Sequence, residues 1–150
     1  FLLCNADVLT NINLEKFYNA HVQSNAISTL AVRERNSSRY LLFDDEDILF
    51  GWENVKTNEI KIPRKLSTVD RQLSTDYQHP LHEFAFSGYH IISPEIFKHN
   101  HCEGKFSMID WYLDICRDHE IKAFHHNDDI WIDIGSQEEL AKANNAILSF

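Results

Sequence analysis

The first third of the chain alternates apolar and amphipathic segments in the manner of an α/β protein. The apolar run 1–4 predicts a fully buried strand, and Asn5-Ala6-Asp7 follows at its carboxyl end. Asn13 then offers an N-cap to a helix whose apolar face has helical spacing: Leu14, Phe17, Tyr18, His21 and Val22. A second apolar strand is expected over 27–32. A strand, a helix and a strand in this order predict a β-α-β unit with a parallel strand pair.

The middle of the chain predicts a hairpin and then an irregular segment. Residues 40–43 and 48–52 read as strands on either side of the acidic sequence 44–47. Four adjacent carboxylates suggest a metal site, but contiguous acids repel one another and favour a solvated turn. Residues 54–82 are polar and carry two prolines, so we expect an irregular excursion with one short strand at 59–62.

The next segment predicts a long strand followed by two helices. Residues 83–92 form the strand, interrupted by Gly88, and a glycine inside a strand often marks a close approach of a ligand to the backbone. Ser93 and Ser107 each offer an N-cap to a following helix.

The last part of the chain predicts two strands and a closing helix. The strands are expected at 121–124 and 130–134, and Ser136 begins a capping box. The inward stripe of the closing helix is expected to comprise Leu140, Ala143, Asn144, Ile147 and Leu148.

These elements predict a three-layer, Rossmann-like α/β fold, with a mixed sheet, helices on both faces and an inserted β-hairpin. The 150 residues are enough for one hydrophobic core, so we expect residues 1–150 to belong to a single domain. A buried parallel strand needs neighbours on both sides. Because such a strand is predicted at Phe1 itself, we expect the fold to be incomplete at the N-terminus.

Charge and cysteine content narrow the classes of partner. The net charge of −9 argues against a nucleic-acid partner and against attachment to a membrane surface. No apolar run approaches the roughly 20 residues that span a bilayer. The three cysteines are an odd number and lack a Cys-x-x-Cys spacing, which favours reduced thiols in a cytoplasm.

Two carboxylates stand where ligands usually bind in α/β sheets. Asp7 follows the first predicted strand and Asp133 lies near the end of the last, and ligands bind outside the carboxyl ends of strands. One or two carboxylates together with substrate phosphates form a typical Mg²⁺ site. The alternative is structural: Asp7 could cap a helix or a turn, and Asp133 could cap the turn at Gly135.

Histidines form two further groups. His99, His101 and Cys102 resemble part of a zinc site, but no fourth ligand has a suitable spacing, so an exposed loop is expected. His125 and His126 are expected to face solvent, with a contact to the sugar as the alternative. The three tryptophans are expected in core or sheet packing.

Three short motifs carry a resemblance to the sugar-1-phosphate nucleotidyltransferases. Residues 2–9 (LLCNADVL) resemble the strand and N-x-D motif of that family, and residues 131–138 (WIDIGSQE) are similar to its W-x-D-I-G-T-P-E segment. Between them, residues 86–97 (FSGYHIISPEIF) are similar to the N-A-G-I-Y-x-x-x-P-E-x-F stretch. The resemblance covers essentially the whole chain and is nearest to mannose-1-phosphate guanylyltransferases and N-acetylmuramate-1-phosphate uridylyltransferases.

The resemblance implies a reaction and roles for residues. The sugar phosphate attacks the α-phosphorus of an NTP, and an NDP-sugar and pyrophosphate form. Asp7 and Asp133 would hold a Mg²⁺ shared by both substrates. The sugar side would be formed by four residues: Asn5, Glu83, Ser87 and Gly88. The expected partners are therefore an NTP and a sugar-1-phosphate, and the resemblance is also compatible with a homo-oligomer.

The chain departs from the family pattern in two respects. The glycine-rich loop, with its Arg and a later Lys-Pro, precedes the N-x-D motif in the family and is absent here, so this chain alone is expected to be inactive. The Lys that precedes the N-A-G segment in many members is also absent, and Arg64 or Lys65 could replace it. Two rival functions stay open: a GT-A-like glycosyltransferase that uses a nucleotide sugar, and a non-catalytic sugar-phosphate-binding module.

Overall fold

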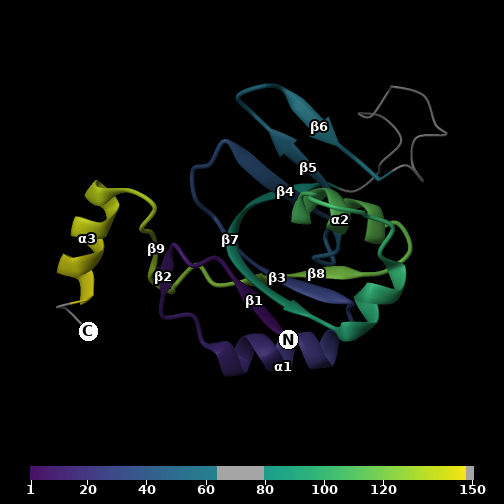
Figure 1. Cartoon of the computed structure of the whole chain (residues 1–150), viewed down its shortest axis with the longest axis horizontal. Coiled ribbons are helices and arrows are strands. Elements are labelled where there is room, and N and C mark those ends of the chain that lie inside the picture. Colours follow the sequence, from purple (N-terminus) through teal and green to yellow (C-terminus); the bar gives the residue numbers. More distant parts are fainter. Residues whose placement is uncertain (64–79, 148–150) are drawn as a thin grey trace.

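A computed structural model describes residues 1–63 and 80–147 as a mixed α/β fold with an open, mixed sheet (Figure 1). The main sheet has the strand order β6-β5-β4-β7-β3-β8, with β1 also paired to β7, and β2 and β9 form a separate two-stranded sheet. The strands are β1 (Leu2–Cys4), β2 (Val8–Thr10), β3 (Ser28–Arg33), β4 (Arg39–Phe43), β5 (Leu49–Asn54), β6 (Glu59–Lys61), β7 (His82–Ile92), β8 (Ile121–His125) and β9 (Trp131–Asp133). The helices are α1 (Leu14–Ser24), the 3-10 helix η2 (Pro94–His99), α2 (Met108–Ile115) and α3 (Gln137–Ile147).

The long strand β7 organises the sheet. It runs antiparallel to β3 on one side, and on the other side it pairs with β4 near its start and with β1 near its end. The predicted parallel pairing of the first strand with the strand after α1 is therefore wrong, because β7 lies between β1 and β3. The parallel pair in the described residues is β3 with β8.

Two apolar clusters pack on opposite faces of β3. Leu30 and Val32 belong to the cluster that includes α2, whereas Ala31 belongs to the cluster that includes Phe17 of α1. Successive residues of a strand point to opposite faces, so α1 and α2 cover different sides of this part of the sheet.

The predicted burial of the first strand is wrong. Leu2 and Leu3 are 43% and 39% exposed, because in the described part of the chain β1 pairs with a strand on one side only. The helix α1 is capped by Asn13 as predicted, but only its Phe17 and His21 are buried. The other members of its apolar stripe are exposed: Leu14, Tyr18 and Val22.

The hairpin is confirmed, and Asp45 and Glu46 at its acidic turn are exposed, as expected of a solvated turn. Strands β4 and β5 pair antiparallel, and Asp44 Oδ1 accepts hydrogen bonds from two backbone amides of the turn. Asp45 and Asp47 each lie within 3 Å of a histidine ring nitrogen. The short strand β6 is also as predicted, and the rest of the excursion, residues 64–79, lies outside the described residues.

The helices of the second half begin as predicted, but the closing helix packs less closely. Ser107 Oγ accepts from the Asp110 amide in α2, and Ser136 Oγ accepts from the Glu139 amide in α3. Figure 1 shows α3 at one side of the sheet, next to β9. The predicted inward stripe is only partly correct, because Ala143 is buried while Leu140 is 46% exposed and Asn144 is exposed. Within residues 1–63 and 80–147, no helix is both long and apolar enough to cross a membrane.

Candidate functional site

Asp7 and Asp133 meet at one edge of the molecule. The chain leaves β1 through residues 5–7 and enters β2, which pairs antiparallel with β9. In this register Val8 lies opposite Asp133, and the Ile134 amide donates to the Asp7 carbonyl over 2.8 Å. The pairing of β2 with β9 therefore brings together two acids that are far apart in the sequence.

The two carboxylates converge on a point beside Gly135. A Cβ placed on Gly135 would lie 3.0 Å from Asp133 Oδ1 and 3.6 Å from Asp7 Oδ2. Both aspartates are exposed, and neither forms an ion pair with another described residue. The two carboxylates therefore lie on the same side of the turn at Gly135.

The structural alternative accounts for only one of the four carboxylate oxygens. Asp133 Oδ1 accepts from the Gly135 amide over 2.9 Å, as expected of a turn cap. In the described residues, Asp133 Oδ2 and the Asp7 carboxylate have no hydrogen-bond partner, and Asp7 caps neither a helix nor a turn. The turn bond fixes the orientation of one carboxylate and leaves the remaining oxygens open to a ligand.

The donor set is of the kind that Mg²⁺ takes. No group of three or more His, Cys, Asp or Glu side chains suited to a metal occurs in the described ranges 1–63 and 80–147. Mg²⁺ needs fewer protein ligands than zinc or calcium, because it keeps several waters and binds through one or two carboxylates plus substrate phosphates. Asp7 and Asp133 fit this requirement, and a preformed cage is not needed.

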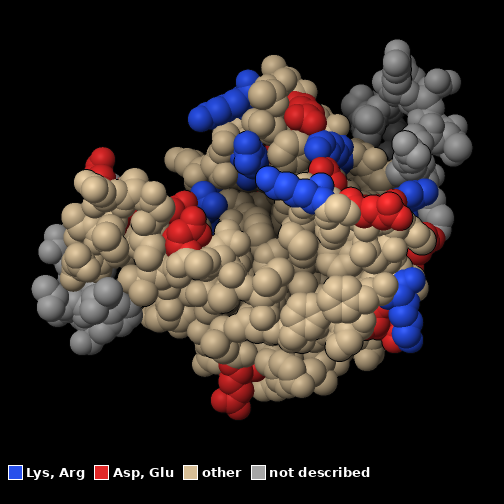
Figure 2. Space-filling view, in the orientation of Figure 1, with Lys and Arg blue, Asp and Glu red and all other residues tan. Residues whose placement is uncertain are grey.

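A cation missed by the sequence analysis shares this cleft. The cleft has a volume of about 850 Å³, and it is lined by Asp7, Arg35, Trp131, Ile132, Asp133, Gly135, Ser136 and Glu139. Figure 2 shows acidic and basic surface meeting where the part of the molecule with β2, β9 and α3 joins the main sheet. The Arg35 guanidinium lies over the Trp131 ring, 4.3 Å from its centroid, and donates to the Phe86 carbonyl over 3.1 Å. Trp131 thus stacks on a cation, which differs from the packing role expected for it, and the alternative cations Arg64 and Lys65 lie outside the described residues.

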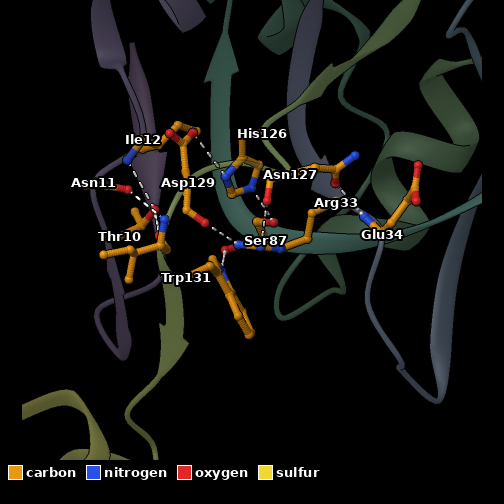
Figure 3. A network of polar contacts seen from close by, with 11 residues as sticks. Thr10, Asn11, Ile12, Arg33, Glu34, Ser87, His126, Asn127, Asp129 and Trp131 are labelled. Carbon is orange, nitrogen blue, oxygen red and sulfur yellow. Dashed lines mark hydrogen bonds and ion pairs between the residues drawn. The ribbon is translucent and has the colours of Figure 1, made fainter. Parts of the chain in front are cut away.

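Behind the cleft lies a buried polar network (Figure 3). His126 Nε2 lies 2.7 Å from Ser87 Oγ, and the Trp131 indole N–H donates to the Ser87 carbonyl over 2.9 Å. His126 Nδ1 is 3.5 Å from an oxygen of Asp129. His126 is 4% exposed, so the expectation that it faces solvent is wrong: the turn that follows β8 folds it back against β7.

This network resembles a Ser-His-Asp triad but lacks access to a substrate. Ser87 is 1% exposed, and a nucleophile must reach the reacting carbonyl. Burial, followed by the neighbouring Arg33, lowers the pKa of His126, so the ring stays neutral at neutral pH. The network holds Trp131 and β7 in place, and the Ser87 hydroxyl is directed at His126 behind the cleft.

The other predicted sugar-side residues divide into two groups. Asn5 and Gly88 lie together, since the Asn5 amide donates to the Gly88 carbonyl and a Cβ on Gly88 would come within 2.8 Å of Asn5 Nδ2. Gly88 has φ of +82°, a conformation that favours glycine. Glu83 lies five residues earlier in β7 and does not line the cleft. Burial and the nearby Glu83 raise the pKa of Glu53, so these two glutamates form a separate acidic pair.

The histidine and cysteine cluster does not form a metal centre within the described residues. His99 Nδ1 lies 3.2 Å from His119 Nε2, and Cys102 packs against the core cluster that includes α2. The expectation of an exposed loop holds for His101, which is exposed.

Comparison with known proteins adds no relative. No protein-family model matches the chain, and no curated protein matches it. The function of the cleft is therefore argued from its side chains alone.

Proposed function

We propose that the protein transfers a nucleotidyl group from an NTP to a sugar-1-phosphate, giving an NDP-sugar and pyrophosphate. This chain would contribute the part that holds the metal and the sugar. Asp7 and Asp133 would bind Mg²⁺, which neutralises charge on the reacting phosphates and orients them for in-line attack. The proposal includes the Rossmann-like, three-layer architecture and a cytoplasmic location, where NTPs are available.

One observation carries the proposal: two exposed, unpaired carboxylates from distant segments approach one point beside Gly135. Exposed acids at a sheet edge usually gain partners or point into solvent, and convergence of two of them costs electrostatic energy unless a cation is bound. The adjacent Arg35 adds a second group suited to phosphate.

The remaining chain elements would shape the site around these groups. The turn bond from the Gly135 amide orients Asp133, and pairing of β2 with β9 orients Asp7. Gly88 leaves room for the Asn5 side chain, which lies where a Cβ would be, and the Asn5 amide would be the group that bonds a sugar hydroxyl.

The test is a product assay on the protein expressed from its complete reading frame. We expect Mg²⁺-dependent pyrophosphate release when one of GTP, UTP, CTP and dTTP is supplied with one of a panel of hexose-1-phosphates. Release of a nucleoside diphosphate from a nucleotide sugar would instead identify the rival glycosyltransferase. Binding of sugar phosphates without release of either product would identify a binding module.

A further inference from the structure

Arg35 carries a positive charge that no carboxylate in the described part of the chain pairs with directly. It is half-buried, and in residues 1–63 and 80–147 it forms no ion pair with a carboxylate. Its Nε is buried without a hydrogen-bond partner in the same part of the chain. A partly buried cation without a counterion costs free energy, so the position calls for an anion.

The guanidinium is nevertheless held in a defined orientation. Its Nη2 is fixed on the Phe86 carbonyl, and its plane lies over the Trp131 ring, which is itself anchored through its indole N–H on the Ser87 carbonyl. Burial and then Arg33 lower the pKa of Arg35, while Asp133 acts in the opposite direction. Arg35 therefore stands close enough to Asp133 to sense its charge, but the two do not form an ion pair.

The neighbouring Arg33 shows what a satisfied arginine looks like in this region. Its Nη1 and Nη2 donate to the carbonyls of Asp129 and Asn127, each over 3.1 Å (Figure 3). Arg33 thus supports the turn after β8. Arg35, two residues further on, makes one such bond within the described residues and lines the cleft.

We infer that Arg35, stacked on Trp131, binds the phosphate group of a substrate in the cleft that it lines together with Asp7 and Asp133. Arginine suits this role, because its planar fork matches phosphate geometry with two donors and stacks on aromatic rings. A phosphate held by both Arg35 and a cation on the two aspartates would neutralise both positive charges at once. The inference rests on the proposed function and assigns the ligand class, a phosphate monoester, to a named residue.

The test is equilibrium binding by isothermal titration calorimetry, which needs no turnover. The full protein is titrated with mannose 1-phosphate in the presence of Mg²⁺, and free mannose serves as the uncharged probe. Arg35→Gln is compared with Lys56→Gln, which removes one positive charge from an exposed turn outside the cleft. We expect Arg35→Gln to weaken binding by roughly 10- to 100-fold and Lys56→Gln to leave it unchanged.

Each outcome decides the inference separately from the proposed function. Unchanged affinity of Arg35→Gln, or failure of the wild-type protein to bind mannose 1-phosphate better than mannose, overturns the role of Arg35. Arg35-dependent binding without pyrophosphate release from any NTP supports the role of Arg35 while the proposed function fails. Should Arg35→Gln not fold, Arg35→Lys decides: it keeps the charge but not the fork, so several-fold weaker binding is expected and unchanged binding overturns the inference.

Discussion

The polar side chains of the cleft and those buried along β7 differ in which groups they bond. The cleft residues Asp7, Asp133 and Arg35 are exposed or half-buried and lack ion pairs with described residues. The buried polar residues of β7 are bonded inside the protein, Ser87 to His126 and His90 to Tyr112. Internal partners indicate a structural role, whereas unpaired charge at a shared point indicates a ligand. The comparison therefore predicts which substitutions cost function and which cost stability.

The largest expected effect is on catalysis, through the two aspartates. Asp7→Asn and Asp133→Asn should each lower the rate of pyrophosphate release by at least about 100-fold, because removing a metal ligand removes charge stabilisation of the reacting phosphates. The free energy of unfolding of both variants, measured by thermal denaturation, should stay within about 0.5 kcal/mol of the wild-type value, since neither carboxylate is buried. A large loss of stability with activity retained would contradict this, because it would show that the two aspartates have a structural role and do not bind the metal.

The second largest effect is expected on stability at low pH, through the buried histidines His90 and His126. Burial lowers the pKa of His90 from 6.5 to about 4, so the folded protein resists protonation that the unfolded chain accepts. This contribution to stability is complete above pH 6.5 and is lost progressively as the pH falls toward 4. The expected loss in the free energy of unfolding is up to about 3 kcal/mol, and the lowered pKa of His126 acts in the same direction.

Urea unfolding between pH 7.5 and 4.5 measures this dependence. The variant His90→Gln should show a flatter profile than the wild type over that range. Identical profiles for the two proteins would show that His90 titrates in the same way in both states, contrary to the account.

Loss of one buried hydroxyl should have a moderate effect. Ser87→Ala leaves the buried Nε2 of His126 without its partner at 2.7 Å, so we expect the free energy of unfolding to fall by about 1–3 kcal/mol. The matched control is Ser38→Ala, at a half-buried serine whose hydroxyl makes no hydrogen bond within residues 1–63 and 80–147, and it should change the free energy of unfolding by less than about 0.5 kcal/mol. Equal losses of stability in Ser87→Ala and Ser38→Ala would show that the hydrogen bond to His126 does not contribute to stability.

The smallest effect is expected at Gly135. Its φ is not positive, so alanine is compatible with the backbone, but the new Cβ would lie 3.0 Å from Asp133 Oδ1. Gly135→Ala should therefore weaken Mg²⁺ binding by roughly a few-fold, because a small shift of one ligand disturbs octahedral geometry. Calorimetric titration with Mg²⁺ measures this, and unchanged affinity would place the metal elsewhere.

Local signals in the sequence predicted most of the elements. Asn13 and Ser107 marked helix starts through their side-chain caps, and Gly88 marked the special point in β7. These caps and turns depend on short-range chemistry, which a single sequence contains. The approach of Asp7 to Asp133 does not, because it arises from antiparallel pairing of β2 with β9.

What the sequence did not predict depends on strand pairing between distant segments. The position of β7 between β1 and β3 leaves β1 exposed, and no local pattern specifies that order. Burial of His126 depends on Ser87, and the placement of Arg35 depends on Trp131 from the other end of the chain. Such contacts become visible only when the sheet is assembled.

Binding of Mn²⁺, followed by electron paramagnetic resonance as a substitute for Mg²⁺, tests the central claim most directly. The full protein is titrated in the presence of mannose 1-phosphate and an NTP, beside Asp7→Asn and Asp133→Asn. The account predicts one bound ion in the wild type and at least about tenfold weaker binding in each variant. Binding of the ion with wild-type affinity in both variants would contradict it.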